Sequence, residues 1–471
     1  MTVTAEVLAE LKKMFPENQI KTDSESLKYY GKDWTTYYNI NAGAIVFPTT
    51  SLQVQDLVKM ARVHKIGLVP SGGRTGLSGG ACATQGEIVV SFAQMNRILD
   101  FNPIDQTVTC QPGVVTEELQ TWALSKNLFY PVDFAARGSS HIAGNIATNA
   151  GGIKVLRYGM TRDWVTSLKV VTGTGELIEL NNSLIKNATG YDLRHLMIGS
   201  EGTLGFIVEA TMRLTTPPPE HKVMVMGLAN LESVMKVFSS FKSQLNLSAF
   251  EMFSELALTK VIAQTGLSRP FATVCPFYVL AEVESPNVEV ESQVLSVFEN
   301  ALEQGWVADG ALSQSAEQQK NFWRLREDIS ESLAKYSPYK NDVSVSISKV
   351  PELMTSLDQI LAKAYPRWEV VWFGHVGDGN LHINILRPPE LNKDQFVAEC
   401  RQVDQIVFEA VRSLRGAISA EHGVGLSKKS FLGYTRSPLE LQIMKQIKAA
   451  FDPDGIINPG KLIDETLSKH S

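Results

Sequence analysis

The stretch Pro70–Ala81, PSGGRTGLSGGA, decides the fold that the sequence predicts. Before it, AIVFPTT (44–50) indicates a strand and a turn, and residues 51–65 place apolar side chains at helical spacing. A short apolar run, IGLVP (66–70), then leads into the glycines. Because glycine at this density disfavours a helix and exposes backbone N–H groups, we expect a β-α-β unit that ends in a loop.

This loop matches neither of the two common phosphate-binding patterns. The chain contains no G-x-G-x-x-G hexapeptide and no G-x-x-x-x-G-K-[ST] run, which excludes a Rossmann fingerprint and a P-loop. The run SGGRTG (71–76) can still form a nest of N–H groups around a pyrophosphate, with a plain flexible loop as the alternative.

Two further glycine-rich segments follow, GSSHIAGNIATNAGG (138–152) and NATGYDLRHLMIGSEGTLGFI (187–207). Small residues over such lengths let the backbone approach a large flat ligand closely. Asn145, Thr148 and Asn149 add neutral hydrogen-bonding groups. Three such stretches in one half of the chain favour a ligand site over three unrelated loops.

Together these segments resemble the FAD-binding domain of the vanillyl-alcohol oxidase and p-cresol methylhydroxylase family, specifically its D-2-hydroxyacid dehydrogenase branch, over nearly all of the chain. The resemblance implies an α+β fold. A two-subdomain FAD-binding domain spans 1–216, and an α+β substrate domain with an antiparallel sheet spans 220–420. A C-terminal helical segment, 421–471, returns to the flavin and the active site.

The resemblance also implies which residues hold FAD. Covalent family members carry a histidine in the first loop, where this chain has Arg74 and Thr75, so we expect noncovalent FAD. The residues implied to bind the cofactor are Gly72, Gly73, Arg74, Thr75, Gly76, Ser139, Gly144, Asn145, Asn149, Gly205, Ile207 and Asn458.

The proline run at residues 217–219 marks the expected domain boundary. After it, VMVMGLA and PFYVLAEVE read as strands, while LESVMKVFSSFKSQL and PNVEVESQVLSVFENALEQG read as helices. This alternation predicts an antiparallel sheet with helices on one face.

The stretch GHVGDGNLHINI (374–385) uses two of the chain's eight histidines. If residues 377–380 form a four-residue hairpin loop, the flanking runs become antiparallel strands in which His375 faces His382. Directly opposed side chains have Cβ atoms about 4.5 to 5.5 Å apart, close enough for two imidazoles to bind one divalent cation. Asn384 falls on the same face. The alternative is a glycine turn flanked by packed histidines.

Two neutral ligands make an incomplete metal site, so we expect a carboxylate from elsewhere. Glu421 and His422 follow a short apolar strand, AISA (417–420), and neighbours in extended chain point to opposite faces. The family resemblance implies His375, His382 and Glu421 as ligands of a divalent metal, with zinc preferred and manganese as the alternative. It implies His422 as the catalytic base.

A second anion site is expected near NFWRLREDISESLAKY (321–336), which predicts one helix buried along Phe322, Leu325, Ile329 and Leu333. Arg326 and Ser330, four apart, share an adjoining face, and Lys340 projects from the polar face of the next strand. A guanidinium and an ammonium suit the second carboxylate of a dicarboxylate.

Resemblance to the D-2-hydroxyglutarate dehydrogenases implies Arg326, Ser330, Lys340, Asn384 and His422 as substrate-binding residues. Those enzymes usually have threonine where this chain has Ser330. As the alternative, Arg326 and Lys340 are solvated surface charges.

Composition narrows the classes of partner. The net charge of −6 argues against nucleic-acid binding, and the four cysteines form no C-x-x-C pair, which suits a reducing compartment. No run approaches the roughly 18 apolar residues of a membrane span, and the N-terminus lacks a signal peptide. We therefore expect a cytoplasmic protein, with peripheral membrane contact and a homodimer left open.

The predicted function is FAD- and metal-dependent oxidation of D-2-hydroxyglutarate to 2-oxoglutarate, with hydride transfer to flavin N5. Within the family, electrons then pass to a separate acceptor such as an electron-transfer flavoprotein or a quinone. Three alternatives stay open at this stage: a D-lactate or broad-specificity D-2-hydroxyacid dehydrogenase, a metal-dependent hydrolase without flavin, and a noncatalytic flavin-binding module.

Overall fold

A computed structural model describes residues 3–463, which fold into two compact units. Of the described residues, the first unit comprises 3–151, 160–217 and 421–463, and the second comprises 152–159 and 218–420. The change of unit at residues 217 and 218 falls in the proline run. The expected first domain, 1–216, had included 152–159, which the structure places with the second unit. The outer ends of the ranges 1–216 and 421–471 lie outside the described residues.

The first unit contains the predicted β-α-β rhythm. A four-stranded sheet has the order β1-β2-β4-β3, and β4 pairs in parallel with both β2 and β3. Helix α3 (Ser51–His64) connects β2 to β3 and buries its apolar stripe in the same core as these strands. The strands are β1 (Ile20–Lys21), β2 (Ala44–Val46), β3 (Leu68–Ser71) and β4 (Ile88–Ser91).

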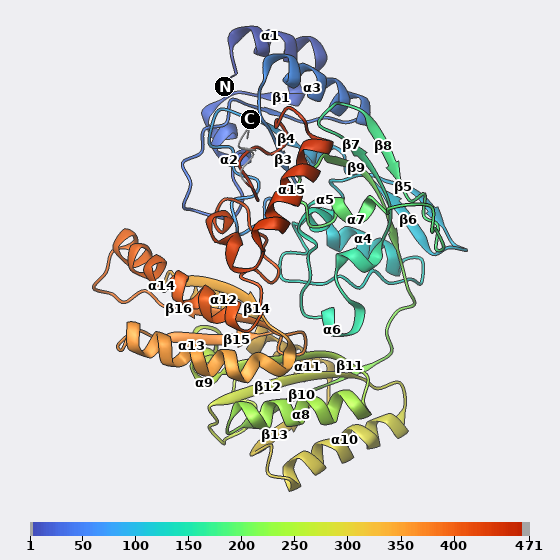
Figure 1. The fold of residues 1–471 in the computed structure, drawn as a ribbon. Helices are drawn as coiled ribbons and strands as arrows, with labels where there is room; N and C mark the ends of the chain where they lie inside the picture. Colours follow the sequence, from blue (N-terminus) through green and yellow to red (C-terminus); the bar gives the residue numbers. More distant parts are fainter. Residues whose placement is uncertain (1–2, 464–471) are drawn as a thin grey trace. The chain divides into compact units, whose positions relative to one another are not determined.

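A second sheet of this unit is antiparallel, with the order β5-β6-β9-β7-β8. Ile457, just after the last helix, forms a bridge to Leu68 of β3, and Figure 1 shows this helix, α15, among the first unit's elements. The strands are β5 (Ile98–Asn102), β6 (Thr107–Cys110), β7 (Val165–Val171), β8 (Leu177–Leu180) and β9 (Phe206–Arg213), and the helices are α1 (Ala5–Met14), α2 (Ser24–Tyr30), α4 (Thr116–Leu124), α5 (Ile142–Thr148), α7 (Arg194–Met197) and α15 (Pro438–Phe451).

The second unit is built on one seven-stranded antiparallel sheet, with the order β13-β10-β12-β11-β15-β16-β14. The predicted α+β fold class is therefore confirmed. The strands are β10 (His221–Leu228), β11 (Leu247–Ser254), β12 (Phe277–Glu284), β13 (Asp309–Leu312), β14 (Tyr339–Ser344), β15 (Val370–Gly374) and β16 (Asn380–Ile385). The helices are α6 (Val155–Tyr158), α8 (Leu231–Gln244), α9 (Glu255–Thr265), α10 (Val288–Glu303), α11 (Ala316–Glu327), α12 (Ile329–Ala334), α13 (Val350–Ala364) and α14 (Lys393–Ser413). Among the described helices, none combines the length and apolar character that a membrane crossing requires.

Helices cover both faces of this sheet, so the expectation of helices on one face was wrong. Phe238 of α8 packs on Phe250 of β11, with ring centroids 5.0 Å apart. Phe253, three residues further along the same strand, lies in a cluster with Phe322 of α11. Side chains three apart on a strand point to opposite faces. The strand segments are apolar on both sides because both sides are buried.

The helix predicted over 321–336 is interrupted at Asp328. This residue caps α11 with ψ near 0°, and its N–H bonds to the carbonyl of Arg324. The carboxylate of Asp328 pairs with Arg324, one turn earlier, at 3.0 Å, and α12 begins at the next residue, Ile329. The predicted buried stripe is nevertheless confirmed, because all four of its members lie in the core: Phe322, Leu325, Ile329 and Leu333.

Candidate active site

The glycine loop after β3 packs directly on the backbone of the second glycine-rich segment. A Cβ added to Gly73 would lie 2.0 Å from the carbonyl oxygen of Ser139, so only glycine allows this approach. Next to it, Arg74 adopts a left-handed φ of 60° and stacks its guanidinium 3.8 Å from the ring centroid of Tyr29. The glycine loop after β3 and the glycine-rich segment 138–152, far apart in the sequence, thus form one surface of the first unit.

Asp33 anchors the glycine loop through hydrogen bonds, a role that was not predicted from the sequence. Its carboxylate accepts the N–H of Gly79 at 2.7 Å and the hydroxyl of Thr35 at 2.6 Å. Asp33 itself is buried. Nothing in the local pattern around an isolated aspartate signals this contact, which spans 46 residues of sequence.

The other residues implied to hold the cofactor fall around the same loops. Asn145 is buried in α5 and donates to Thr116 Oγ1 at 2.6 Å, whereas the Cβ position of Gly144 meets no atom of the described chain within 4 Å. Asn149 ends α5 in the left-handed conformation, and Ile207 is buried in β9. Asn458 donates to the carbonyls of Gly80 and Glu201, at 2.9 and 2.8 Å, and so joins the C-terminal turn to both glycine-rich regions.

Three buried polar atoms around this surface find no hydrogen-bond partner among residues 3–463: Ser71 Oγ, His141 Nδ1 and Asn458 Oδ1. Burial and the charge of Arg74 lower the pKa of His141 to about 4, so its imidazole is neutral at pH 7. Unsatisfied buried groups are costly unless something binds them. Together with the open space beside Gly144, they fit a polar cofactor such as FAD. Ser71 and His141 lie inside the two glycine-rich motifs but were not predicted to bind the cofactor.

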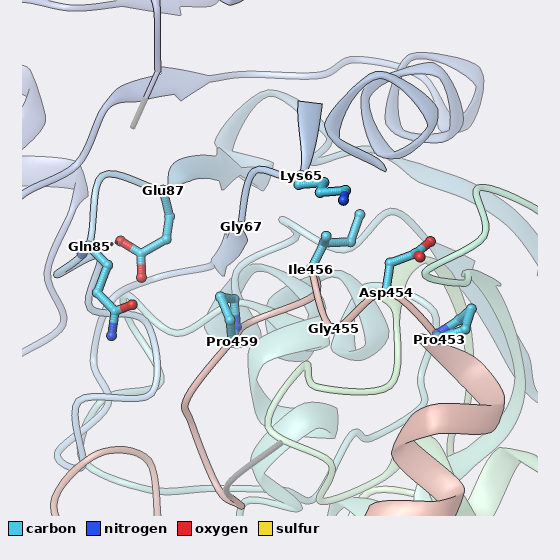
Figure 2. Close-up of a pocket in the computed structure, with 9 residues that line it drawn as sticks. All are labelled: Lys65, Gly67, Gln85, Glu87, Pro453, Asp454, Gly455, Ile456 and Pro459. Carbon is cyan, nitrogen blue, oxygen red and sulfur yellow. Dashed lines mark hydrogen bonds between the residues drawn. The ribbon is translucent and has the colours of Figure 1, made fainter. Parts of the chain in front are cut away.

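A shallow pocket in the first unit, shown in Figure 2, is a weaker candidate. Its polar wall includes Glu87, but this carboxylate already accepts the N–H of Gln85 at 2.6 Å and lies 3.3 Å from the ammonium of Lys461. The lining residues, none of them predicted for any site, are Lys65, Gly67, Gln85, Glu87, Pro453, Asp454, Gly455, Ile456 and Pro459.

In the second unit, the predicted hairpin around the two histidines is confirmed as β15 and β16, but its register is not. Phe373, rather than His375, pairs with His382, so the turn spans 375–379. The N–H groups of Asp378, Gly379 and Asn380 all bond to the carbonyl of His375, and Gly379 takes a φ of 89°. This tight turn displaces the pairing by two residues, which preserves the face of each side chain.

The two imidazoles meet in spite of that displacement, with ring centroids 5.3 Å apart. His375, His382 and Glu421 each offer one ligand atom, and these atoms lie within 4.8 Å of one another. Glu421 directly follows Ala420, the last residue of the second unit, whose N–H is held by Asp342 Oδ2 at 3.1 Å. Two imidazoles and one carboxylate are a donor set suited to zinc or manganese.

The predicted strand over 417–420 is reduced to a single bridge between Ala417 and Ser344. Ala420 donates its N–H to the Asp342 side chain instead of to a neighbouring strand. As a result, Glu421 and His422 do not point to opposite faces: Glu421 Oε1 lies 3.6 Å from His422 Nε2. The carbonyl of His422 accepts the hydroxyl of Ser78, in the glycine loop, at 2.6 Å.

A buried glutamate beside the histidines was missed by the sequence analysis. Glu251 of β11, 1% exposed, accepts from His375 Nδ1 at 2.8 Å and lies 2.8 Å from Arg326 Nη2. Burial alone would raise the pKa of its carboxyl, but His375 and Arg326 together hold that pKa below its ordinary value. Glu251 is therefore an ionised carboxylate that lies between His375 and Arg326.

The residues predicted to bind the second carboxylate are only partly brought together. Arg326 is 6% exposed and lies over the ring of Phe373, while Lys340 pairs in register with Asn384, so their side chains share a face. Lys340 is exposed on the edge strand, although desolvation lowers the pKa of its ammonium. Ser330 is also exposed.

Among the residues predicted to bind the second carboxylate, Arg326 has buried nitrogen atoms without hydrogen-bond partners. Its Nε and Nη2, like Asn384 Oδ1, find no hydrogen-bond partner in the described part of the chain. The short contact to Glu251 thus brings charges together without the alignment of a hydrogen bond. Buried guanidinium donors without acceptors are suited to an incoming anion.

Comparison with known proteins identifies the family of this chain. Residues 217–462 match the family model of the C-terminal domain of FAD linked oxidases, and residues 42–181 match an FAD binding domain. The chain belongs to the FAD-linked oxidases. This FAD-linked oxidase is therefore an FAD-binding oxidoreductase, which speaks against the flavin-free hydrolase that the sequence had left open.

Individual relatives extend over nearly the whole of this FAD-linked oxidase. It is 55% identical over 456 residues to a D-2-hydroxyglutarate dehydrogenase of Stutzerimonas stutzeri (strain A1501), covering 97% of this chain and 98% of the relative. It is 36% identical to a putative mitochondrial D-lactate dehydrogenase of Schizosaccharomyces pombe, covering 94% and 86%. The crystal structure of p-cresol methylhydroxylase has the same fold, with a TM-score of 0.78 at 15% identity over 98% of this chain and 96% of that one.

Proposed function

We propose that this chain oxidises D-2-hydroxyglutarate to 2-oxoglutarate, using noncovalent FAD and a divalent metal. The observation that supports this substrate most directly is Arg326, whose buried Nε has no acceptor in the described chain and whose Nη2 lies 2.8 Å from Glu251 Oε2 without an aligned hydrogen bond. A dicarboxylate brings one, since its second carboxylate can take both nitrogens of the guanidinium fork. The 55% sequence identity to a D-2-hydroxyglutarate dehydrogenase supports the same substrate.

The residues divide between two ends of the substrate. Arg326 and Lys340 bind the distal carboxylate, while Asn384 Oδ1, buried without a partner in residues 3–463, accepts a hydrogen bond from the reacting end. His375, His382 and Glu421 hold the metal. When bound, FAD accepts a hydride from C2 of the substrate, and the cation polarises the hydroxyl at that carbon.

His422 removes the hydroxyl proton as the C2 hydride leaves. Its backbone is fixed at the glycine loop by Ser78, and its Nε2 lies 3.6 Å from the Glu421 carboxylate. A base next to a metal-ligating carboxylate is in reach of a hydroxyl that the same metal binds. The step balances: the hydroxyl proton goes to His422, and the C2 hydrogen leaves as a hydride that carries two electrons. Bound FAD would take up this hydride and would later pass the two electrons to a separate acceptor such as an electron-transfer flavoprotein or a quinone.

FAD is held through the surface around Gly73, Ser139 and Asn458 rather than by a covalent bond. Arg74 occupies the first loop and is stacked on Tyr29, so the loop offers no histidine for attachment. Ser71 Oγ, His141 Nδ1 and Asn458 Oδ1 supply hydrogen-bonding groups to the cofactor.

The second candidate is a D-lactate or broad-specificity D-2-hydroxyacid dehydrogenase. The exposure of Ser330 and Lys340 favours it, because a loose second anion site discriminates less between acids. An anaerobic titration of the yellow protein with D-2-hydroxyglutarate and with D-lactate decides between them. Bleaching of the flavin by hydroxyglutarate at much lower concentration supports the proposal. Equal bleaching by both acids supports the broader enzyme, and bleaching by neither leaves a noncatalytic flavin module.

A further inference from the structure

Glu251 lies where the two halves of the proposed substrate site meet. One carboxylate oxygen, Oε1, is 2.8 Å from His375 Nδ1, and the other, Oε2, is 2.8 Å from Arg326 Nη2. The three residues come from β11, from the turn after β15 and from α11, and 124 residues separate Glu251 from His375. A single side chain thus contacts one proposed metal ligand and the proposed carboxylate-binding arginine.

We infer that Glu251 is a positioning residue that aligns His375 for the metal and Arg326 for the second carboxylate of the substrate. This inference rests on the proposed function and goes beyond it, because it makes metal binding and dicarboxylate recognition depend on one buried group.

The contact to His375 fixes the tautomer of the ring. An ionised carboxylate only accepts hydrogen bonds, so Nδ1 of His375 carries the proton that Glu251 Oε1 receives. The imidazole then presents Nε2, with its lone pair, as the ligand atom. A carboxylate behind a ligating histidine fixes the orientation of the ring and raises its basicity.

The contact between Glu251 and Arg326 is an ion pair without the geometry of a hydrogen bond. The guanidinium is buried, and its charge is balanced by Glu251 at 2.8 Å. Nη2 makes this ion pair, whereas Nε has no hydrogen-bond acceptor in the described residues, so the arginine is held in place while a donor remains available to a ligand. Phe373, whose ring centroid is 4.9 Å from the guanidinium carbon, confines it further.

A purely structural ion pair is the competing explanation, and the chain contains a matched control for it. Glu282 of β12 is also buried, at 6% exposed, and is also surrounded by hydrogen-bond donors. It accepts from Trp323 Nε1 at 2.8 Å and pairs with Lys154, and neither of these partners belongs to a proposed site. Replacing Glu282 removes a buried carboxylate from the same sheet without changing His375 or Arg326.

The test compares Glu251→Gln and Glu282→Gln in the full chain loaded with FAD. Glutamine keeps the shape but cannot accept at both ends, since one end becomes an amide donor. Zinc affinity is measured by equilibrium dialysis against a chromophoric chelator, and kcat and KM are measured with D-2-hydroxyglutarate and D-lactate. Flavin absorbance and urea unfolding report on folding.

For Glu251→Gln we expect about 10- to 100-fold weaker zinc binding, the range seen when such outer carboxylates are lost. We also expect KM for D-2-hydroxyglutarate to rise at least about tenfold more than KM for D-lactate, because only the dicarboxylate uses Arg326. Glu282→Gln lowers stability but leaves zinc affinity and the preference between acids unchanged.

If Glu251→Gln does not fold, Glu251→Asp replaces it, because aspartate keeps the charge but is one methylene too short to reach both partners. We expect it to lose at least one of the two properties. A folded, yellow variant with wild-type zinc affinity and wild-type preference overturns the inference alone. Failure of the wild-type protein to bind either zinc or manganese overturns it together with the proposed function.

Discussion

Asp342 Oδ2 accepts the backbone N–H of Ala420 at 3.1 Å, while Asp342 Oδ1 lies 3.7 Å from Nδ1 of His382. One buried carboxylate therefore contacts both a proposed metal ligand and the residue that precedes another, Glu421. The same Oδ1 accepts from Asn380 Nδ2 at 2.7 Å, at the start of β16. Each of the two proposed histidine ligands thus has a buried carboxylate behind it, Glu251 for His375 and Asp342 for His382.

Metal removal should abolish oxidation of the hydroxyacid without releasing the flavin. The proposed ligands are His375, His382 and Glu421, whereas the residues proposed for FAD lie elsewhere in the sequence. We expect a chelator to lower activity at least about 100-fold, since a cation that polarises the hydroxyl contributes several kcal/mol. Flavin absorbance in the retained fraction after gel filtration should be unchanged.

Glu421→Gln should reproduce this loss without a chelator, because an amide is a weaker ligand than a carboxylate. Glu390→Gln, which changes an exposed glutamate of the second unit, is the control. Full activity of the chelated protein, verified free of metal by elemental analysis, would contradict the metal assignment.

Arg326→Ala should distinguish a dicarboxylate from a monocarboxylate substrate. A charge-assisted hydrogen bond to a carboxylate is worth about 1.5 to 3 kcal/mol, so kcat/KM for D-2-hydroxyglutarate should fall about 10- to 100-fold. The value for D-lactate should change far less. Arg324→Ala, on the same helix but paired with Asp328 near the surface, should affect neither acid.

Because Arg326→Ala also leaves the buried Glu251 without its guanidinium partner, the variant should unfold at lower urea concentration. Arg326→Lys restores a charge near Glu251 but not the fork, and it should recover stability more than activity. Parallel losses for both acids in Arg326→Ala would point to a general role in folding rather than to substrate choice.

The histidine pair shows how far sequence reasoning reached in this site. The predicted register was displaced by two residues, yet both imidazoles remained on one face because the side-chain pattern of a strand repeats every two residues. A displacement of one residue would have separated them. The turn itself depends on three N–H groups that share the His375 carbonyl, and periodicity does not encode that arrangement.

Glu251, Asp342 and Asp33 could not be assigned from the sequence for a different reason. Each is a single acidic residue outside any recognisable motif, and its role comes from partners far along the chain, such as His375, 124 residues from Glu251. The helix break at Asp328 was hidden in the same way, because the buried stripe continues through it. Glycine-rich loops carry a local signature, whereas isolated carboxylates do not.

Glycine substitutions should locate the cofactor. Gly73→Ala places a Cβ 2.0 Å from the Ser139 carbonyl and should disrupt the loop, lowering both stability and FAD content. Gly144→Ala meets nothing within 4 Å in the described chain, so the FAD-free protein should keep its stability. If the space beside Gly144 belongs to FAD, this variant should bind FAD at least about tenfold more weakly.

Gly433→Ala is the matched control, since it also meets nothing within 4 Å but lies outside the proposed cofactor surface. FAD affinity is followed by the quenching of flavin fluorescence on binding. Equal affinity of Gly144→Ala, Gly433→Ala and the wild-type protein would place the flavin elsewhere.

His141 should make stability depend on pH in a defined window. Its pKa is about 4 in the folded protein against an ordinary value of 6.5, because burial and Arg74 disfavour the charged ring. Between these values the unfolded chain binds a proton that the folded chain does not, so the free energy of unfolding falls as pH falls. Above about pH 6.5 this histidine has little effect on the pH dependence of stability. At pH 5 it lowers the free energy of unfolding by about 2 kcal/mol relative to neutral pH.

His141→Gln removes this titration while keeping a polar side chain, so its free energy of unfolding should fall less between pH 7.5 and pH 5 than that of the wild-type protein. Urea unfolding at both pH values, with FAD in fixed excess, gives the difference. His64→Gln, which removes a histidine paired with Glu10 in the same unit, controls for the loss of any histidine. Identical pH dependence in the wild-type protein and in His141→Gln would mean that the folded protein accommodates a charged ring at this position. The neutral hydrogen-bonding group proposed for the cofactor would then have to be reassigned.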